Sequence, residues 1–558
     1  GRAVDDCATA EHLARAGETY LSRSLADVLR ADVLVEDGDA FGRLSGIRSR
    51  LPSPSALRFP SFDSTVSRVF IPETILHRDE RGEFRQAVNL FMRFPDLPNE
   101  KLQEFVQTLF RLKEQYGGLI NRLDFGDKGC NMLMLWGAPV AYENDIGRAL
   151  NFLLDLQASV DFPITTGVTY YIAHAGFLGG EIFECYTCYG WGVNLASRFM
   201  MSAPDGHTWI DERVARRIKN RFDFSYLGAQ RFKGFDTEQK VYQLERRKPH
   251  EEAPHEGELV GRAAELSRLT EFLGPLWQGK SAGLISVWGD AGIGKSRLVY
   301  ELRVSPALEG QSVLWGFCHS DQVLRHSFNP FRYWLLRYFG LTSEMSDDAR
   351  KQAFNQKLDD LLASLPDLEL AADLERVRSA LGALLDLTWP DSFYEKLDAE
   401  GRYNNTLLAL TSLLKAESLR QPVVIFIEDA QFLDEDSAAF LPRLKRALAG
   451  YSVAMIVSAR HSGPDSTLES LSDAVIELGA LSTQAMASLA EIYLGGAASP
   501  ELVDFLQERS EGNPYFAEQI LIYLQEEALL EMGEGGWRAS RALRDASLPA
   551  DIRALLMA

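Results

Sequence analysis

The segment Gly289-Asp290-Ala291-Gly292-Ile293-Gly294-Lys295-Ser296 decides the fold of the second half of the chain. It follows the apolar run Gly283–Trp288 and precedes a helical pattern over 297–303. Its glycines let backbone N–H groups wrap phosphates, Lys295 can reach the β- and γ-phosphate oxygens, and the Ser296 hydroxyl can ligate Mg²⁺. The spacing and its flanks therefore predict a P-loop (Walker A) site for ATP between a strand and a helix.

A second apolar run, 423–427, ends in two acids, Glu428 and Asp429. Acids at the tip of a buried strand can hold Mg²⁺, directly or through water, and orient an attacking water. Alone, the pair could merely cap a strand, but beside a P-loop it predicts the acidic half of an ATPase site. A third run, 453–458, leads to Arg460, which is either a sensor of the γ-phosphate or an arginine without a functional role.

The pattern around these motifs predicts a multidomain protein of α/β and α+β class. Short apolar strands alternate with helices over about 255–480, which indicates a mostly parallel sheet covered on both faces. The pattern over 481–558 is helical almost throughout and predicts a helical lid or winged-helix region. The stretch 547–553 looks like the start of a further helix, so this region is expected to be truncated.

Composition excludes several classes of protein. The formal net charge of −21 argues against a nucleic-acid-binding surface, because neutralising phosphates requires clustered Lys and Arg. We find no apolar run near the length of a transmembrane helix. Five cysteines form no disulfide framework and favour a reducing compartment, the cytoplasm. Cys185 and Cys188 have the spacing of a redox or zinc half-site, but without a second pair we favour ordinary strand packing.

Two Pro-containing stretches, 48–64 and 246–258, have the composition of linkers. The residues between them alternate apolar runs with helical patterns, which predicts an α+β or α/β domain over 66–245. Strands are expected at 86–94, 118–125, 131–136 and 164–171, and helices at 99–116, 144–157 and 194–202.

The second half resembles the signal-transduction ATPases with numerous domains (STAND), a branch of the AAA ATPases. The segment 259–262 with Glu265 matches the motif that opens the domain of that family. The segment 428–434 resembles its acidic motif, with Glu428 at a position where the family usually has Asp. Gly512-Asn513-Pro514 resembles the Gly-x-Pro element of the lid. The resemblance implies a nucleotide-gated switch, with a protein effector as a possible partner.

The segment 190–198 resembles the helix signature of class III nucleotidyl cyclases, and the resemblance runs through about 66–245. Asn194 and Arg198 stand four residues apart and share a helix face. In most proteins such a pair is a solvated surface. Here the resemblance implies a ferredoxin-like core in which one of them orients a ribose and the other contacts the triphosphate as charge develops.

In this family two Asp residues hold two Mg²⁺ ions, and the first normally follows the opening strand. Arg93 stands at that position, and a cation cannot ligate Mg²⁺. Asp127 either matches the second metal position or stabilises a turn, and we favour the turn. No intact cyclase metal site is therefore expected in this chain.

The pattern also resembles the second catalytic domain of tandem soluble adenylyl cyclases, which supplies base, ribose and triphosphate contacts. The base-contacting cation of that domain corresponds to Arg122, with Lys128 as the alternative. Thr187 matches the adenine-side threonine, which favours ATP over GTP.

The first fifty residues look like a second copy of the same signature. Residues 1–22 parallel 190–211, with Asp5 and Thr9 in place of Asn194 and Arg198. We expect residues 1–50 to be the C-terminal remnant of a preceding cyclase domain. Its metal-binding acids would then lie upstream, and that domain would be a partner missing from this chain.

These resemblances imply an adenylyl cyclase, which converts ATP with Mg²⁺ to cyclic AMP and pyrophosphate, joined to a regulatory P-loop domain. This chain is expected to be inactive, or nearly so, as a cyclase by itself. The alternative is a signalling or transcription-regulatory STAND ATPase with a degenerate, non-catalytic cyclase domain. Metal-binding acids in the missing copy would favour the enzyme.

Overall fold

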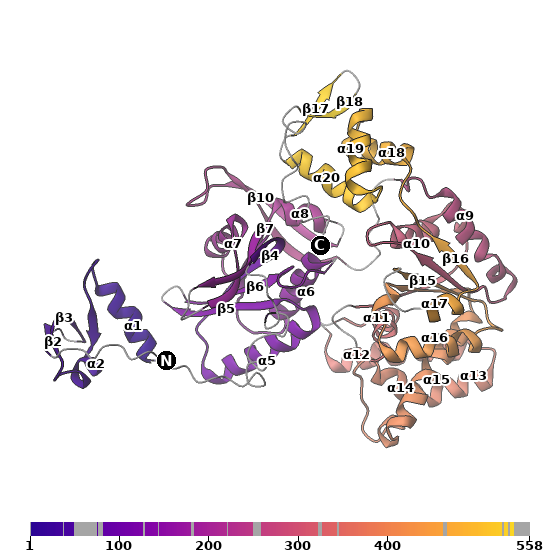
Figure 1. The fold of residues 1–558 in the computed structure, drawn as a ribbon. Coiled ribbons are helices and arrows are strands. Elements are labelled where there is room, and N and C mark those ends of the chain that lie inside the picture. Colours follow the sequence, from indigo (N-terminus) through magenta and orange to yellow (C-terminus); the bar gives the residue numbers. More distant parts are fainter. Residues whose placement is uncertain are drawn as a thin grey trace. The chain divides into compact units, whose positions relative to one another are not determined.

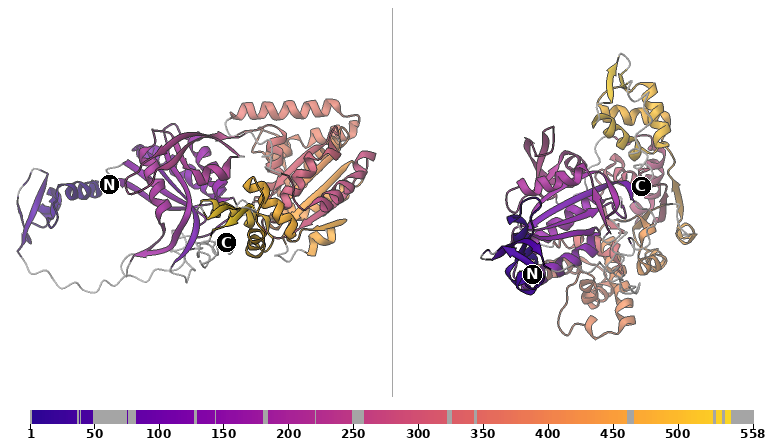
Figure 2. Two further views of the ribbon diagram at one scale, coloured as in Figure 1. Left: turned by 90° about the horizontal axis from the view of Figure 1, so that it is seen from above. Right: turned by 60° about the vertical axis from the view of Figure 1, so that its left-hand side comes forward.

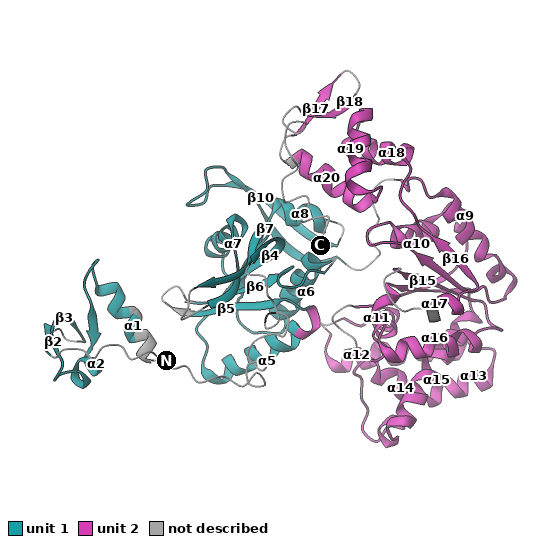
Figure 3. Ribbon diagram, in the orientation of Figure 1, with its two compact units in different colours: residues 1–113, 117–248 teal, residues 114–116, 249–558 magenta. Residues whose placement is uncertain are grey.

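The structure, a computed structural model, describes residues 2–36, 38, 40–48, 75, 82–126, 129–142, 144–179, 184–219, 221–248, 258–321, 326–342, 345–460, 466–526, 529–533 and 536–540. The chain divides into two compact units, residues 1–113 with 117–248 and residues 114–116 with 249–558 (Figure 3). Many elements of each unit are labelled in Figure 1, and Figure 2 gives two further views.

The middle region, residues 82–248, is built on an antiparallel core. Its chain order β4–α5–β5–β6–α6–β7 and its strand order β7-β4-β6-β5 define a ferredoxin-like arrangement, which confirms the predicted fold class. The bounds are β4 Gly82–Phe94, α5 Asn99–Tyr116, β5 Leu119–Gly126, β6 Gly129–Trp136, α6 Asp145–Ala158 and β7 Thr165–Gly179. The predicted helix 99–116 matches α5, and β7 runs eight residues beyond the predicted run because both of its edges are paired, so hydrophobic periodicity alone did not set its end.

The remaining elements extend this sheet on the side of β7. They are β8 Glu184–Tyr189, α7 Trp191–Ser202, β9 Thr208–Asp211, α8 Glu212–Ile218, β10 Phe222–Gln230 and β11 Gln239–Arg247. Helix α7 lies directly on β7: a Cβ added at Gly167 would lie 2.1 Å from the carbonyl oxygen of Ala196. Glycine at position 167 therefore permits the close approach that sets the height of α7 above the sheet. On β8, Cys185 is exposed and Cys188 is buried, as expected for strand packing.

The N-terminal region, residues 2–48, repeats the second half of the middle region. Its elements are α1 Arg2–Leu13, β1 Tyr20–Ser22, α2 Arg23–Val28, β2 Val33–Glu36 and β3 Phe41–Ile47. The strand order β1-β3-β2 reproduces β9-β11-β10, and α1 and α7 begin and end at equivalent positions of the repeat.

Details of the repeat also agree. A glycine at positive φ precedes the first strand in each copy, Gly17 at 88° and Gly206 at 78°. The next helix is capped in each copy by a side chain that accepts from the backbone N–H three residues on, Ser22 from Leu25 and Asp211 from Val214. The two segments thus share their local geometry. That residues 1–50 belong to a first cyclase domain stays a prediction.

The P-loop region, residues 258–478, holds a parallel sheet of order β13-β14-β15-β12-β16, as predicted. Its strands are β12 Gly283–Trp288, β13 Leu314–His319, β14 Val423–Glu428, β15 Val453–Ala459 and β16 Ala474–Glu477. The edge strand β16 was not predicted, because its four residues carry a single buried side chain, Ile476.

Alternate residues of these strands enter two separate hydrophobic clusters, one on each face of the sheet. Leu284, Ile425 and Met455 belong to one cluster, and Ile285, Val424 and Ile456 belong to the other. Helices α9 Ala263–Phe272 and α10 Lys295–Val304 contribute to the second cluster. Both faces are therefore covered, which explains why the strands have nearly continuous apolar sequences.

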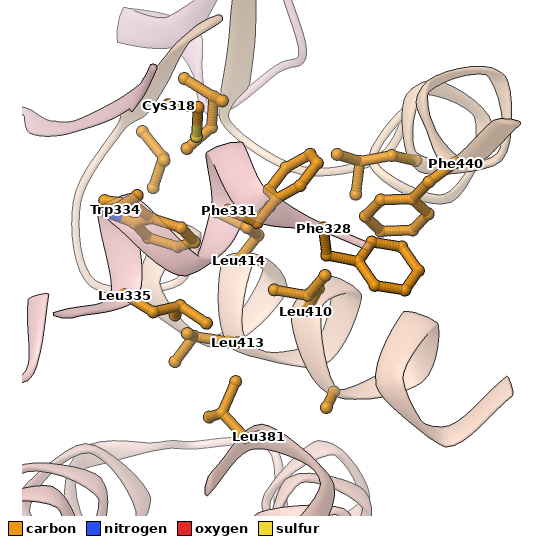
Figure 4. Packing of buried hydrophobic residues seen from close by; sticks show 14 of the residues in the cluster. Cys318, Phe328, Phe331, Trp334, Leu335, Leu381, Leu410, Leu413, Leu414 and Phe440 are labelled. Carbon is orange, nitrogen blue, oxygen red and sulfur yellow. The ribbon is translucent and has the colours of Figure 1, made fainter. Parts of the chain in front are cut away.

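The first cluster is enlarged by a helical insertion between β13 and β14. It consists of α11 Asn329–Tyr338, α12 Asp347–Ser364, α13 Leu368–Arg376, α14 Arg378–Ala383 and α15 Ala399–Ser418. Figure 4 shows its centre, where Phe331 and Trp334 of α11 meet Leu413 and Leu414 of α15 and Phe440 of α16 (Glu435–Ala447). Helix α17, Ser466–Leu471, follows β15.

The lid region, residues 481–540, has a core of its own. It contains α18 Thr483–Leu494, α19 Pro500–Ser510 and α20 Pro514–Glu526. The hairpin β17 Leu530–Gly533 and β18 Gly536–Ala539 departs from the largely helical pattern expected here, and glycines at its turn favour strand reversal. The expected helix start at 547–553 lies outside the described residues.

Candidate nucleotide-binding sites

The P-loop joins β12 to α10. Gly292 and Gly294 have φ values of 73° and 105°, which a side chain would strain. Lys295, the first residue of α10, is only 6% exposed. Its Nζ donates to the carbonyl oxygens of Gly289 at 3.0 Å and Asp290 at 2.9 Å. A buried ammonium requires such oxygen partners, and phosphate oxygens are suited to take their place.

Glu428 faces the P-loop from the end of β14. The hydroxyl of Ser296 donates to its Oε1, and its Oε2 lies 3.0 Å from Nδ1 of His319. Residue His319 ends β13 and pairs with Glu428 in the register of the parallel sheet. Burial disfavours the imidazolium, but the hydrogen bond and charge of Glu428 outweigh it and raise the pKa of His319 above its ordinary value.

The other predicted residues of this site have different surroundings. The Asp429 backbone is left-handed, with φ 54°, and its N–H donates to Ser458 Oγ at 3.1 Å. The Asp429 carboxylate accepts from Gln431 Nε2 at 3.0 Å. Arg460 follows β15, and its guanidinium lies 5.8 Å from the centre of the Phe432 ring. Of the two acids, Glu428 is the one in contact with Ser296.

Mg²⁺ prefers carboxylate and hydroxyl oxygens. Ser296 and Glu428 supply both kinds, and their oxygens already touch each other across the end of the sheet. These two residues therefore suit a magnesium ion bound with ATP phosphates.

Arg262, in the motif that opens the domain, is buried behind the P-loop. Its guanidinium donates to the carbonyl oxygen of Gly479 at 2.6 Å and to that of Ile293 at 3.4 Å, and it pairs with Glu265 at 3.4 Å. Since Ile293 belongs to the P-loop and Gly479 follows β16, this arginine ties the loop to the segment that leads into the lid.

The lid contacts the P-loop through the Gly-Asn-Pro segment. Asn513 Nδ2 donates to the carbonyl oxygen of Ala291 at 2.7 Å, and its Oδ1 accepts from the N–H of Tyr515 at 3.1 Å. Gly292 packs so closely here that an added Cβ would lie 2.7 Å from Tyr515 Cβ. Glu518 lies on α20, the helix that follows Asn513. Burial raises the pKa of Glu518, and the charge of Arg297 in α10 opposes this rise.

In the middle region, Asn194 and Arg198 lie on the exposed face of α7. The opposite face buries five side chains: Val193, Leu195, Ala196, Phe199 and Met200. Within the described residues, no hydrogen bond or ion pair engages either polar side chain. Both are therefore available to a ligand.

The residue beside Thr187 is Asn121. Thr187 Oγ1 donates to Asn121 Oδ1 at 2.8 Å, and Asn121 Nδ2 donates to the carbonyl oxygen of Tyr186 at 2.7 Å. Asn121 sits at a bulge of β5 opposite β6, which turns it toward β8. Arg122 instead pairs with Asp124 at 2.7 Å and is largely exposed. Lys128 and Asp127 lie outside the described residues.

The sequence pattern indicated Arg122 because it aligned a cation with the base position. A bulge shifts side-chain direction by one residue, and no local signal marks it. The structure therefore brings Asn121 to Thr187, a contact that the sequence did not indicate, and the base-contacting role of Arg122 stays a prediction.

Arg93 occupies the position where a metal-binding Asp was expected, and it pairs with Asp205 at 2.8 Å. A second cation lies in the loop between β10 and β11. Phe232 of this loop packs on Phe199 of α7, and Phe235 packs on Trp191. Exposed Lys233, between them, is therefore held near the helix of Asn194 and Arg198.

Among the residues that the structure describes, no three His, Cys, Asp or Glu side chains gather as a metal site would require. In the same ranges, no helix combines the length and apolarity needed to cross a bilayer.

Comparison with known proteins adds to this geometry. Residues 258–457 match the family described as the AAA ATPase domain. The chain is 23% identical over 440 residues to adenylate cyclase type 10 of Mus musculus, covering 74% of this chain and 26% of that protein. It is 25% identical over 349 residues to an uncharacterized protein of Rhizobium meliloti, covering 59% of this chain and 32% of that one. The chain thus spans about a quarter to a third of the length of these relatives.

Among solved structures, the adenylyl cyclase CyaB from P. aeruginosa is 19% identical, covering 30% of this chain and 97% of that chain, with a TM-score of 0.28. The chain thus combines an AAA ATPase domain with sequence similarity to adenylate cyclase type 10.

Proposed function

We propose that this chain is a component of an adenylyl cyclase that converts ATP to cyclic AMP and pyrophosphate, with its AAA ATPase domain as a regulatory nucleotide sensor of the STAND kind. The observation that carries the proposal is the exposed pair Asn194 and Arg198 on a ferredoxin-like region, in the same chain as a P-loop. Similarity to adenylate cyclase type 10 over 440 residues supports it.

The middle region would bind the nucleotide from one side. Arg198 and Lys233 are cations on neighbouring segments and suit the triphosphate, and Asn194 can hold the ribose. The Thr187 hydroxyl donates its hydrogen to Asn121, so the hydroxyl oxygen keeps lone pairs that can accept a hydrogen bond from the amino group of adenine. Asn121 would then position Thr187 for base recognition.

In the middle region, Arg93 stands at the position of the first metal-binding acid, and a cation cannot ligate Mg²⁺. The proposed reaction therefore needs a second cyclase domain that carries the Asp pair. Magnesium, when bound there, stabilises phosphate charge and promotes ionisation of the ribose 3′-hydroxyl. In the ATPase domain, Ser296 and Glu428 would hold the Mg²⁺ that accompanies ATP, and Lys295 would bind its phosphates.

Four further features belong to this proposal. Arg460 would sense the γ-phosphate. Asp429, in the acidic motif, would help to hold Mg²⁺ or to orient the attacking water. A protein effector would act through the ATPase half. All five cysteines are free of disulfides, which supports a cytoplasmic location.

A second function has one observation in its favour. Arg93, at the place of a metal ligand, is engaged in an ion pair with Asp205 at 2.8 Å. A switch ATPase that uses a non-catalytic cyclase fold for assembly would look the same at this position.

The test is ATP binding with Mg²⁺, measured by calorimetry on the wild type, Lys295→Ala and Arg198→Ala. Matched controls are Lys280→Ala and Arg111→Ala, which remove exposed cations of the same two regions. We expect two binding events, one lost in each site variant and both kept in the controls.

The two outcomes separate the candidate functions. Loss of a distinct event in Arg198→Ala supports the cyclase. If Lys295→Ala removes all binding and Arg198→Ala removes none, the middle region binds no ATP without a second cyclase domain, the P-loop is the working nucleotide site of this chain, and the result favours the switch ATPase.

A further inference from the structure

Glu428 is held by two partners on opposite sides. Ser296 of the P-loop helix donates to Oε1, and Nδ1 of His319 lies 3.0 Å from Oε2. The three residues come from α10, β14 and β13, so the carboxylate joins three separate elements. A carboxylate with both oxygens engaged is fixed in direction as well as in position.

The geometry of the sheet makes this arrangement possible. Strands β13 and β14 are parallel neighbours, and His319 and Glu428 are register partners at the ends where both strands stop. Their side chains are 44% and 28% exposed, so the pair lies at the rim of the site and not in the core. The imidazole also lies 5.9 Å, ring to ring, from Tyr333 of α11, which limits its rotation.

The length of the Glu428 side chain explains why the contact with His319 matters. Its side chain has one more methylene and one more torsion than the Asp that the STAND motif usually places here. A longer carboxylate can turn away from the metal unless a second group holds it. The hydrogen bond to His319 fixes Oε2 and leaves Oε1 directed at Ser296.

We propose that His319 is a positioning residue of the magnesium–ATP site, and that it directs the Glu428 carboxylate toward the ion through the bond to Oε2. The inference rests on the proposed ATP-binding role of the P-loop and adds the residue that makes Glu428 suitable in place of Asp. Partners of this kind, which hold a ligand without touching the metal, commonly change metal affinity by roughly 10- to 100-fold.

The experiment compares two variants at His319. His319→Phe keeps a flat ring against Tyr333 and removes the hydrogen bond. His319→Asn keeps a donor near the place of Nδ1 and removes the ring. Calorimetry of ATP binding to the full chain, with Mg²⁺ and with EDTA, gives the factor by which the ion strengthens binding, and melting temperatures report on folding.

We expect His319→Phe to reduce the enhancement by Mg²⁺ about tenfold, with ATP affinity in EDTA and the melting temperature unchanged. His319→Asn should retain most of the enhancement. In a Glu428→Asp background the shorter carboxylate cannot reach residue 319, so His319→Phe should have no further effect.

Two results overturn the inference. An unchanged Mg²⁺ enhancement in His319→Phe shows that the bond has no role at the metal. Equal losses with Mg²⁺ and with EDTA, accompanied by a lower melting temperature, show a purely structural histidine.

Lys295→Ala separates this failure from failure of the proposed function. If that variant keeps both ATP-binding events at wild-type affinity, the proposed P-loop role is wrong and so is the inference. If it loses one event and His319→Phe behaves as wild type, only the inference is wrong.

Discussion

Replacing Asn513 by Asp separates the role of the amide nitrogen of this side chain from the role of its oxygen at the junction of lid and P-loop. The remaining Oδ1 can still accept from the N–H of Tyr515, so the start of α20 stays capped. The second oxygen replaces the amide that donates to Ala291 and places two acceptors at the present distance of 2.7 Å. Asn513→Asp therefore removes the hydrogen bond to Ala291 and leaves the bond from the Tyr515 N–H to the Gly292 carbonyl oxygen at 3.4 Å.

The magnitude follows from the contacts. The lost hydrogen bond is worth about 1 kcal/mol, and leaving buried acceptors unpaired costs about 1–3 kcal/mol more. Asn513 is 7% exposed, so water offers little compensation. The lid should therefore open more easily by about 2–4 kcal/mol, which corresponds to roughly 30-fold or more in its opening equilibrium.

Amide hydrogen exchange of α20, read against α12 as an internal reference, measures this opening. The matched control is Asn405→Asp, because Asn405 donates its amide to the carbonyl oxygen of Gly401 at 2.8 Å within α15, away from the lid. We expect faster exchange of α20 in Asn513→Asp and no change of α20 in the control.

Exchange of α20 at the wild-type rate in Asn513→Asp would refute the assignment of Asn513 as the tie between lid and P-loop. Equal acceleration in both variants would point to a general effect of added charge and would refute it as well.

Three more changes have defined outcomes. Burial raises the pKa of Asp145 to about 6, so wild-type stability should fall by about 2 kcal/mol as pH rises from 4 to 6; Asp145→Asn should remove this dependence in urea titrations at both pH values. Gly167→Ala should cost about 1–3 kcal/mol, because the new Cβ meets the Ala196 carbonyl oxygen at 2.1 Å, whereas Gly274→Ala meets nothing within 4 Å and should be neutral by the same titrations. Phe331→Ala should lower the free energy of unfolding by about 3–5 kcal/mol, measured by thermal unfolding, because it leaves a cavity in the hydrophobic cluster of Figure 4.

Local sequence determined the elements and the P-loop. Helix α5 and strand β12 match their predicted bounds, because hydrophobic periodicity and flanking Gly or Pro are written in consecutive residues. The P-loop was readable for the same reason, since its glycines, lysine and serine serve one short turn. Strand β16 and the hairpin β17–β18 were not predicted from the sequence, because a strand of four residues is defined by pairing with a neighbouring strand.

Only the tertiary structure decided which side chains meet. Asn121 reaches Thr187 through a bulge, Glu428 is shared by Ser296 and His319, and Asn513 bonds the P-loop. Each contact joins residues far apart in the chain, and the direction of each side chain depends on register and packing. A single sequence records the residue type at each position but not these distances, so the candidate residues could be named from it and their contacts could not.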